Sequence, residues 1–353
     1  MNGIRDLRSY TYDEISKIAN EAGAKPYVAR QIFGWLHDKK TDDISSMTNV
    51  SKSVREFLAK EYPIRPVKRS SVLISQIDGT RKYIHSLYDG NIIETVMLPY
   101  DFGNSACISS QAGCRMGCAF CASTIDGLAR NLTAGEMAAQ IYSLEEDAGE
   151  RINHVVIMGS GEPFDNYDEL DRFIRIITDE RGANLSGRNI TVSTCGIVPK
   201  IREFANRKYA LTLALSLHAV TDEKRKKIMP IAARYPLSEV LDACRYYFDA
   251  TGRRITLEYS LISGFNDSDE DMKGLASIAR DLSAHVNLIP VNPIKERNFA
   301  PTSPKDAILL KNKLEKNNIN VTIRREMGRD ISGACGQLRR SFSDYEVYGD
   351  RNA

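Results

Sequence analysis

Cys114-Arg-Met-Gly-Cys118-Ala-Phe-Cys121 contains three cysteines, separated by three and then by two residues. No other segment is so dense in one metal-binding residue type. Thiolates are soft ligands that suit iron–sulfur clusters and zinc. Closed sites of either kind take four ligands, yet the nearest further cysteine, Cys107, lies seven residues before Cys114. A four-iron cluster held by three thiolates would leave one iron open, and a substrate can bind at an open metal position.

The C-x3-C-x2-C spacing resembles that of the radical S-adenosylmethionine (SAM) enzymes. In those enzymes the open iron binds the amino and carboxylate groups of SAM, which is cleaved reductively to a 5′-deoxyadenosyl radical. The alternative is a structural zinc site with a histidine as fourth ligand. All five histidines are far from the three cysteines in sequence, and none has the spacing of a zinc finger.

Composition limits the class of protein. The chain has 353 residues, which predicts about two domains. It is 42% hydrophobic and 27% charged, as in soluble globular proteins. No apolar run reaches the ~18 residues of a membrane span, and the polar N-terminus lacks a signal-peptide core, so we expect no membrane association. Seven cysteines, an odd number, favour a reducing, cytoplasmic setting. The net charge of +2 leaves any RNA binding to local patches.

In the first third of the chain, the spacing of apolar residues changes once, from a helical to a strand-like pattern. Apolar residues recur at helical spacing over residues 12–22, 26–36 and 51–62, which predicts a helical domain over 1–62. β-branched residues then cluster over 71–76, 82–88 and 92–98, with Asp-Gly turn signals at 78–79 and 89–90. We therefore predict a small antiparallel β extension or linker over 63–99.

The rest of the chain alternates between short apolar strands and amphipathic helices. Strands are expected at 106–110, 155–158, 190–194, 211–217, 256–262 and 286–290, with an additional edge strand at 321–325. Helices are expected at 133–147, 168–179, 237–250 and 269–282, among others. This rhythm predicts an α/β fold with a parallel sheet or partial barrel of about six βα units over 100–345, followed by a tail at 346–353.

Polar residues and glycines follow the ends of these strands, where parallel α/β barrels carry their active sites. The turn 159–163 has two glycines that allow close approach to a ligand, and Glu162 could pair with a cationic amine. Ser193, Ser216, His218 and Asn292 each stand at a strand end. Any one of them alone is more simply a polar cap or a satisfied buried histidine. Their shared place on the barrel rim favours a ligand site.

Several other residues have competing interpretations. Glu94, on a predicted strand, would most simply be a solvated side chain. Cys335 lies between Gly333 and Gly336, which suggests an exposed loop where its thiolate could act as a nucleophile toward an electrophilic methyl group. Cys195 and Cys244 are more simply interpreted as small, buried hydrophobic residues. Basic clusters such as 224–227, 253–254, 324–325 and 339–340 are usually solvated faces, and would be phosphate contacts if the substrate is RNA.

Together these motifs resemble the RlmN/Cfr family of radical SAM RNA methyltransferases. The resemblance rests on Glu94, CISSQAGC at 107–114, the three-cysteine segment, GSGEP at 159–163, Ser193, SLH at 216–218, NLIPVNP at 287–293 and GACGQL at 333–338. KPYVARQIFGWL at 25–36 resembles the N-terminal accessory domain of that family. Nearly the whole chain is covered. The resemblance implies a partial (βα)6 radical-SAM barrel.

The family implies a mechanism for methylating an electron-poor adenine carbon. Cys335 would take a methyl group from one SAM and become S-methylcysteine. A second SAM, on a [4Fe-4S] cluster held by Cys114, Cys118 and Cys121, would yield the radical that activates this methyl group for addition to adenine. Glu94 resembles the base that removes the adenine proton. Cys107 would then attack the Cys335 sulfur and leave a transient disulfide, which external thiol resets.

The family also implies the remaining partners. The residues that resemble its SAM contacts are Gly161, Glu162, Ser193, Ser216, Leu217, His218 and Asn292. Pro163 favours the RlmN branch, which methylates C2 of adenine in 23S rRNA near the peptidyl transferase centre and in tRNA beside the anticodon. A flavodoxin or ferredoxin would supply electrons, and we expect a monomer. The alternatives are a Cfr-type enzyme acting at C8 and a non-catalytic zinc or iron–sulfur RNA-binding protein.

Overall fold

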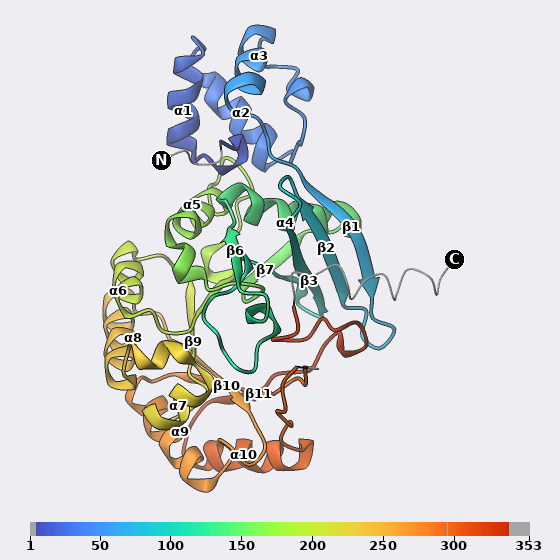
Figure 1. Cartoon of the computed structure of the whole chain (residues 1–353). Coiled ribbons are helices and arrows are strands. Elements are labelled where there is room, and N and C mark those ends of the chain that lie inside the picture. The colour runs from blue at the N-terminus through green and yellow to red at the C-terminus, as the bar shows by residue number, and fades with distance from the viewer. Residues whose placement is uncertain (1–4, 295, 339–353) are drawn as a thin grey trace.

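The computed structural model describes residues 5–294 and 296–338. Its N-terminal part contains the helices α1 (Tyr12–Glu21), α2 (Tyr27–His37) and α3 (Lys52–Glu61). A capping box between Thr11 and Glu14 starts α1 and satisfies backbone donors at its first turn. The apolar faces of the three helices form a hydrophobic core of their own, and they lie together at one end of the molecule (Figure 1).

The N-terminal helices dock onto the barrel through specific polar contacts. The Ser9 hydroxyl accepts a hydrogen bond of 2.9 Å from the backbone N–H of Gly135, and the His37 ring lies 3.0 Å from the Tyr142 hydroxyl. Both contacts are buried and end on α4 (Ala134–Ala148). The domain boundaries expected from the sequence stay predictions, and the tail at 346–353 lies outside the described residues.

A ten-stranded sheet forms the body of the protein, in the order β1-β2-β3-β4-β7-β8-β9-β10-β11-β12. Its first strands, β1 (Val67–Ile74), β2 (Arg81–Leu87) and β3 (Ile92–Tyr100), pair antiparallel. β3 also pairs antiparallel with β4 (Gly103–Cys107). The predicted β extension is therefore no separate sheet, because it continues the edge of the barrel sheet.

From β4 onward the sheet is parallel, which confirms the expected α/β fold with six βα units and an edge strand. The strands that follow are β7 (Ile152–Ile157), β8 (Ile190–Thr194), β9 (Thr212–Ser216), β10 (Thr256–Leu261), β11 (His285–Pro290) and β12 (Val321–Ile323). The intervening helices are α4, α5 (Tyr167–Ile177), α6 (Val198–Arg207), α7 (Asp222–Ile228), α8 (Leu237–Thr251), α9 (Asp269–Asp281) and α10 (Pro304–Lys316). The short β5 (Gln111–Gly113) and β6 (Leu128–Asn131) pair separately around the cysteine segment.

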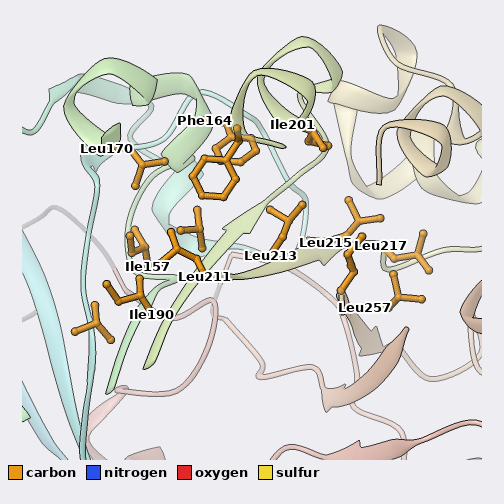
Figure 2. Close-up of a cluster of buried hydrophobic side chains, with 14 of the residues drawn as sticks. Ile157, Phe164, Leu170, Ile190, Ile201, Leu211, Leu213, Leu215, Leu217 and Leu257 are labelled. Atoms are coloured by element: carbon orange, nitrogen blue, oxygen red, sulfur yellow. The ribbon is translucent and has the colours of Figure 1, made fainter. Parts of the chain in front are cut away.

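The core lies between the sheet and the helices that follow its strands. Figure 2 shows Ile157, Ile190 and Leu213 from three neighbouring strands in one cluster with Phe164 and Ile201 from the helical side. Burial of this apolar surface is the main force that holds the helices against the outer side of the strands, where α6, α8, α9 and α10 are seen in Figure 1. Every helix in the described residues is too short or too polar to span a bilayer.

Candidate active site

A cavity of about 960 Å³ opens at the carboxyl ends of the parallel strands, and we call it the main cavity. Its wall includes the three clustered cysteines and most of the strand-end residues expected from the sequence. The expected residues that line it are Cys114, Cys118, Cys121, Gly161, Glu162, Ser193, Ser216, His218, Asn292 and Cys335. Segments far apart in the chain therefore meet here because parallel strands end at the same edge.

The cysteine segment is held by backbone contacts on two sides. The N–H of Ala119 donates to the carbonyl of Ile228 at 2.8 Å, and the N–H of Ala122 donates to the carbonyl of Gly336 at 2.8 Å. The Thr124 hydroxyl donates to the carbonyl of Cys121 at 2.9 Å. These contacts fix the segment between α7 and the C-terminal loop, so that its thiols face the main cavity.

The donor set fits an iron–sulfur cluster. Burial raises the pKa of the Cys114 thiol to about 12 and that of Cys118 well above its usual range, and neighbouring thiols add to the effect. These side chains therefore become thiolates only beside a positively charged centre such as a metal cluster would supply. In the part of the chain that the structure describes, no three histidine, cysteine or acidic side chains converge on one point as a single metal ion requires. A cubane cluster presents its irons at separate corners, so its thiolate ligands need not converge.

Glu162 lies buried beside the cysteines and is already hydrogen-bonded. Its Oε2 accepts from the backbone N–H of Cys195 at 2.7 Å, and its Oε1 accepts from that of Phe164 at 3.0 Å. Burial raises the pKa of the Glu162 carboxyl, while these donors oppose the rise. Cys195 is buried as expected, and it also lines the main cavity.

Three further strand-end residues line the main cavity. The Ser193 and Ser216 hydroxyls lie 3.3 Å apart on β8 and β9. His218 accepts a hydrogen bond at Nδ1 from the backbone N–H of Ser260 at 2.9 Å, which leaves Nε2 as the protonated nitrogen. Burial lowers the pKa of His218 to about 3, so the ring is neutral. Leu217 is fully buried in the core and does not line the cavity.

Cys335 lies where two cavities meet. The second one, about 580 Å³ and here called the side cavity, lies between β3 and the segment 324–338 and is lined by both Cys335 and Cys107. The Asn292 side chain donates from Nδ2 to the carbonyl of Cys335 at 2.9 Å. The structure thus brings Cys107 and Cys335 to one cavity, although they stand at opposite ends of the barrel sequence.

Glu94 is not the solvated side chain that a lone strand glutamate suggests. It is 1% exposed, and its Oε1 lies 3.0 Å from the Lys82 Nζ, which is also buried. Lys82 in turn donates to the carbonyl of Ser332 at 3.3 Å, three residues before Cys335. Glu94 lines neither cavity, but this contact connects it to the Cys335 loop.

The view of the basic clusters as solvated faces is wrong at two positions. Arg225 is fully buried and donates to the carbonyl of Cys195 at 2.6 Å. Arg324, partly exposed, lines both cavities beside Cys335. Glu258, 5% exposed on β10, also lines the main cavity and was missed. The only signal for Glu258 in the sequence was its place in the alternating pattern of a predicted strand.

Two family models match the chain. The Radical SAM superfamily model matches residues 108–276, and the model of the ribosomal RNA large subunit methyltransferase N-terminal domain matches residues 5–64. The probable dual-specificity RNA methyltransferase RlmN of Lachnospira eligens is 53% identical over 342 residues, which cover 96% of this chain and 97% of that protein. The chain belongs to the RlmN family. A second RlmN relative, from Lachnoclostridium phytofermentans, is 52% identical over 347 residues, which cover 98% of this chain and 98% of that protein.

A solved structure of a radical SAM methyltransferase supports the same assignment. The radical SAM methyltransferase from Sphaerobacter thermophilus is 41% identical and superposes with a TM-score of 0.89, covering 94% of this chain and 98% of that one. As a member of the RlmN family, the chain is a radical SAM RNA methyltransferase, and the family implies SAM and a [4Fe-4S] cluster as cofactors. Membership of this enzyme class argues against the alternative that the chain is a non-catalytic RNA-binding protein.

Proposed function

We propose that this protein methylates C2 of adenine in 23S rRNA and in tRNA, through an S-methylcysteine at Cys335. The observation that carries the proposal is the position of Cys335, which shares the main cavity with the three clustered thiols and the side cavity with Cys107. A methyl carrier must meet a methyl donor on one side and a resolving thiol on the other. The dual-specificity name of the relatives supports the two RNA substrates.

Cys114, Cys118 and Cys121 would hold the cluster, and the residues around Glu162, Ser193, Ser216, His218 and Asn292 would hold SAM. When bound, the cluster supplies the electron for reductive cleavage of SAM to a 5′-deoxyadenosyl radical. Gly161 has a positive φ of 109°, which suits close approach of the backbone to a ligand. The contact proposed for Leu217 would come from its backbone, because its side chain is packed in the core.

The remaining roles belong to three side chains. Cys335 accepts the methyl group and presents it to the adenine. Glu94 removes the C2 proton from the adduct, and the Lys82 ammonium beside it stabilises the carboxylate before that step. Cys107 attacks the Cys335 sulfur, which forms a disulfide and breaks the bond between that sulfur and the new methyl carbon. External thiol then reduces the disulfide.

The setting of the reaction follows from the same chemistry. The seven cysteines form no disulfide in the structure, and a catalytic cycle that passes through a transient one needs a reducing compartment, for which we propose the cytoplasm. A flavodoxin or ferredoxin would be the electron donor, and the enzyme would act as a monomer. The adenine must leave its base stack before C2 is reachable, at a cost of a few kcal/mol.

The decisive experiment follows the methyl group on the protein. The cluster-reconstituted enzyme is incubated anaerobically with methyl-labelled SAM and without RNA, and the Cys335 peptide is analysed by mass spectrometry. We expect label on Cys335 in the wild type and none in Cys335→Ala, while Cys244→Ala, changed in the core, keeps the label. An unlabelled Cys335 peptide from enzyme with intact iron and sulfide content would refute the carrier role. Mapping the methyl position in the product RNA then separates C2 from C8.

A further inference from the structure

Arg324 occupies a position next to both reactive thiols. It follows the last strand, β12, and its backbone N–H donates to the carbonyl of Leu288 at 2.8 Å, which continues the strand pairing by one residue. Its side chain lines the main cavity and the side cavity, together with Cys335 and Met158. The guanidinium therefore stands at the wall that separates the two cavities.

Met158 contacts both the Arg324 guanidinium and the Cys107 thiol. Arg324 Nη1 lies 3.7 Å from the Met158 Sδ, and the backbone N–H of Met158 faces the Cys107 sulfur. Cys107 lies at the end of β4, in register with Val156 on β7 and with Val96 on β3, so apolar side chains flank it on both strands. Arg325 and Glu326 also line the side cavity, but among the residues that the structure describes Arg324 is the cation that acts on the Cys107 thiol.

Cys107 needs such a cation for its proposed step. Burial raises the pKa of its thiol to about 12, the neighbouring Cys335 raises it further, and Arg324 lowers it. The titratable groups that line the side cavity with Cys107 are Tyr100 from β3 and Arg324, Arg325, Glu326 and Cys335 from the C-terminal segment, while β7 and its end contribute uncharged side chains. A thiol does not displace a sulfur substituent effectively until it has lost its proton.

We propose that Arg324 is a positioning residue that stabilises the thiolate of Cys107 for its attack on Cys335. The proposal rests on the proposed function, in which Cys107 resolves the adduct. The Cys107 proton leaves to water through the side cavity. The thiolate forms the S–S bond, the bond from the Cys335 sulfur to the methylene carbon breaks, and its electron pair goes to that carbon, which takes a proton and becomes the methyl group. Both sulfurs are oxidised and the carbon is reduced by two electrons, so the step needs no further oxidant.

The test measures the alkylation rate of Cys107 in the full-length, cluster-free Cys335→Ser protein. Iodoacetamide is the probe, and the labelled peptide is quantified by mass spectrometry between pH 7 and 9. Arg324→Met keeps the side-chain stem without its charge, Arg324→Lys keeps the charge, and Arg329→Gln changes a neighbouring exposed arginine. An opposite charge within ~4–6 Å shifts a pKa by about 1–3 units, so Arg324→Met should lower the rate at least about tenfold, while the other two variants stay close to the parent.

Each other result counts against the proposal. A rate that is unchanged in Arg324→Met, or lowered equally in Arg324→Lys, overturns it. A purely structural role would open the side cavity and raise the rate. If circular dichroism shows that Arg324→Met does not fold, Met158→Leu removes only the sulfur contact and must still lower the rate. Failure of the proposed function would appear as an unlabelled Cys335 in the SAM experiment, which the alkylation rates do not involve.

Discussion

The Asn292 side chain, at the end of β11, donates a hydrogen bond of 2.9 Å to the backbone carbonyl of Cys335. A second contact next to it runs from the Gln337 side chain to the carbonyl of Pro293, at 3.3 Å. Together they attach the C-terminal loop to the rim of the barrel. The proposed methyl carrier is thus positioned by a residue that the sequence pointed to as a SAM contact.

Removing the Asn292 contact should slow methylation of Cys335 more than it weakens SAM binding. One hydrogen bond contributes about 1 kcal/mol, so we expect Asn292→Ala to lower the single-turnover rate of Cys335 labelling about fivefold. Gln337→Ala, which loses a longer and exposed bond, should have a smaller effect. The two rates are measured with saturating labelled SAM, and equal rates in Asn292→Ala and the wild type would contradict the positioning role.

The ion pair between Lys82 and Glu94 should be costly to break from one side. Both side chains are buried, with 5% and 1% exposed, and a buried charge left without its partner costs about 3–5 kcal/mol. We therefore expect Lys82→Met to reduce the free energy of unfolding by about 3 kcal/mol, measured by urea denaturation of the cluster-free protein. The Lys82→Met/Glu94→Gln double variant should recover part of the loss. A double variant whose loss of stability equals the sum of the losses in the two single variants would show that the two residues are not coupled.

His37 should make the docking of the N-terminal helices depend on pH. Burial lowers its pKa in the folded protein from 6.5 to about 3, so between these values the unfolded chain binds a proton that the folded chain does not. The contribution of neutral, buried His37 to the free energy of unfolding is complete above pH 6.5. It falls by about 1.4 kcal/mol per pH unit as the pH drops from 6.5 toward 3. His37→Gln should flatten the pH dependence of the free energy of unfolding, measured by urea denaturation at each pH, by this amount.

A matched variant separates this proton linkage from the loss of a contact. Tyr142→Phe removes the hydroxyl that lies 3.0 Å from the His37 ring but leaves the ring buried. It should lower the stability at every pH and keep the slope. If His37→Gln and the wild type show the same slope between pH 6.5 and 5, the histidine is not the linked group.

Gly161 should tolerate no side chain. Its φ is +109°, and a Cβ built there would lie 2.7 Å from the Gln111 Cβ and from the Ser110 Oγ. We expect Gly161→Ala to cost about 2–3 kcal/mol from strain and crowding and to lower SAM affinity in equilibrium binding. Gly149, which also has a positive φ but open space around it, is the control, with about 1 kcal/mol expected for Gly149→Ala. Equal costs at the two positions would mean that the turn relaxes without strain.

Local patterns in the sequence determined which elements form. Hydrophobic periodicity and capping residues predict the helices and strands to within a few residues, as at 190–194, where the expected strand and β8 coincide. The three-cysteine spacing and the glycine-bounded Cys335 are likewise readable, because a ligand set or a turn depends on neighbours along the chain. The antiparallel strands were also found, although not their union with the barrel, since pairing between β3 and β4 depends on register across the sheet.

The tertiary structure alone decided how charged residues are used. Lys82 and Glu94 pair across β2 and β3, and the guanidinium of Arg324 reaches the Cys107 pocket only because β12 lies beside β11. Arg225 looked like part of a solvated cluster, yet its guanidinium satisfies buried carbonyls next to the cysteine segment. A charge is stable in the interior only when partners surround it, and those partners come from distant parts of the chain that folding brings together.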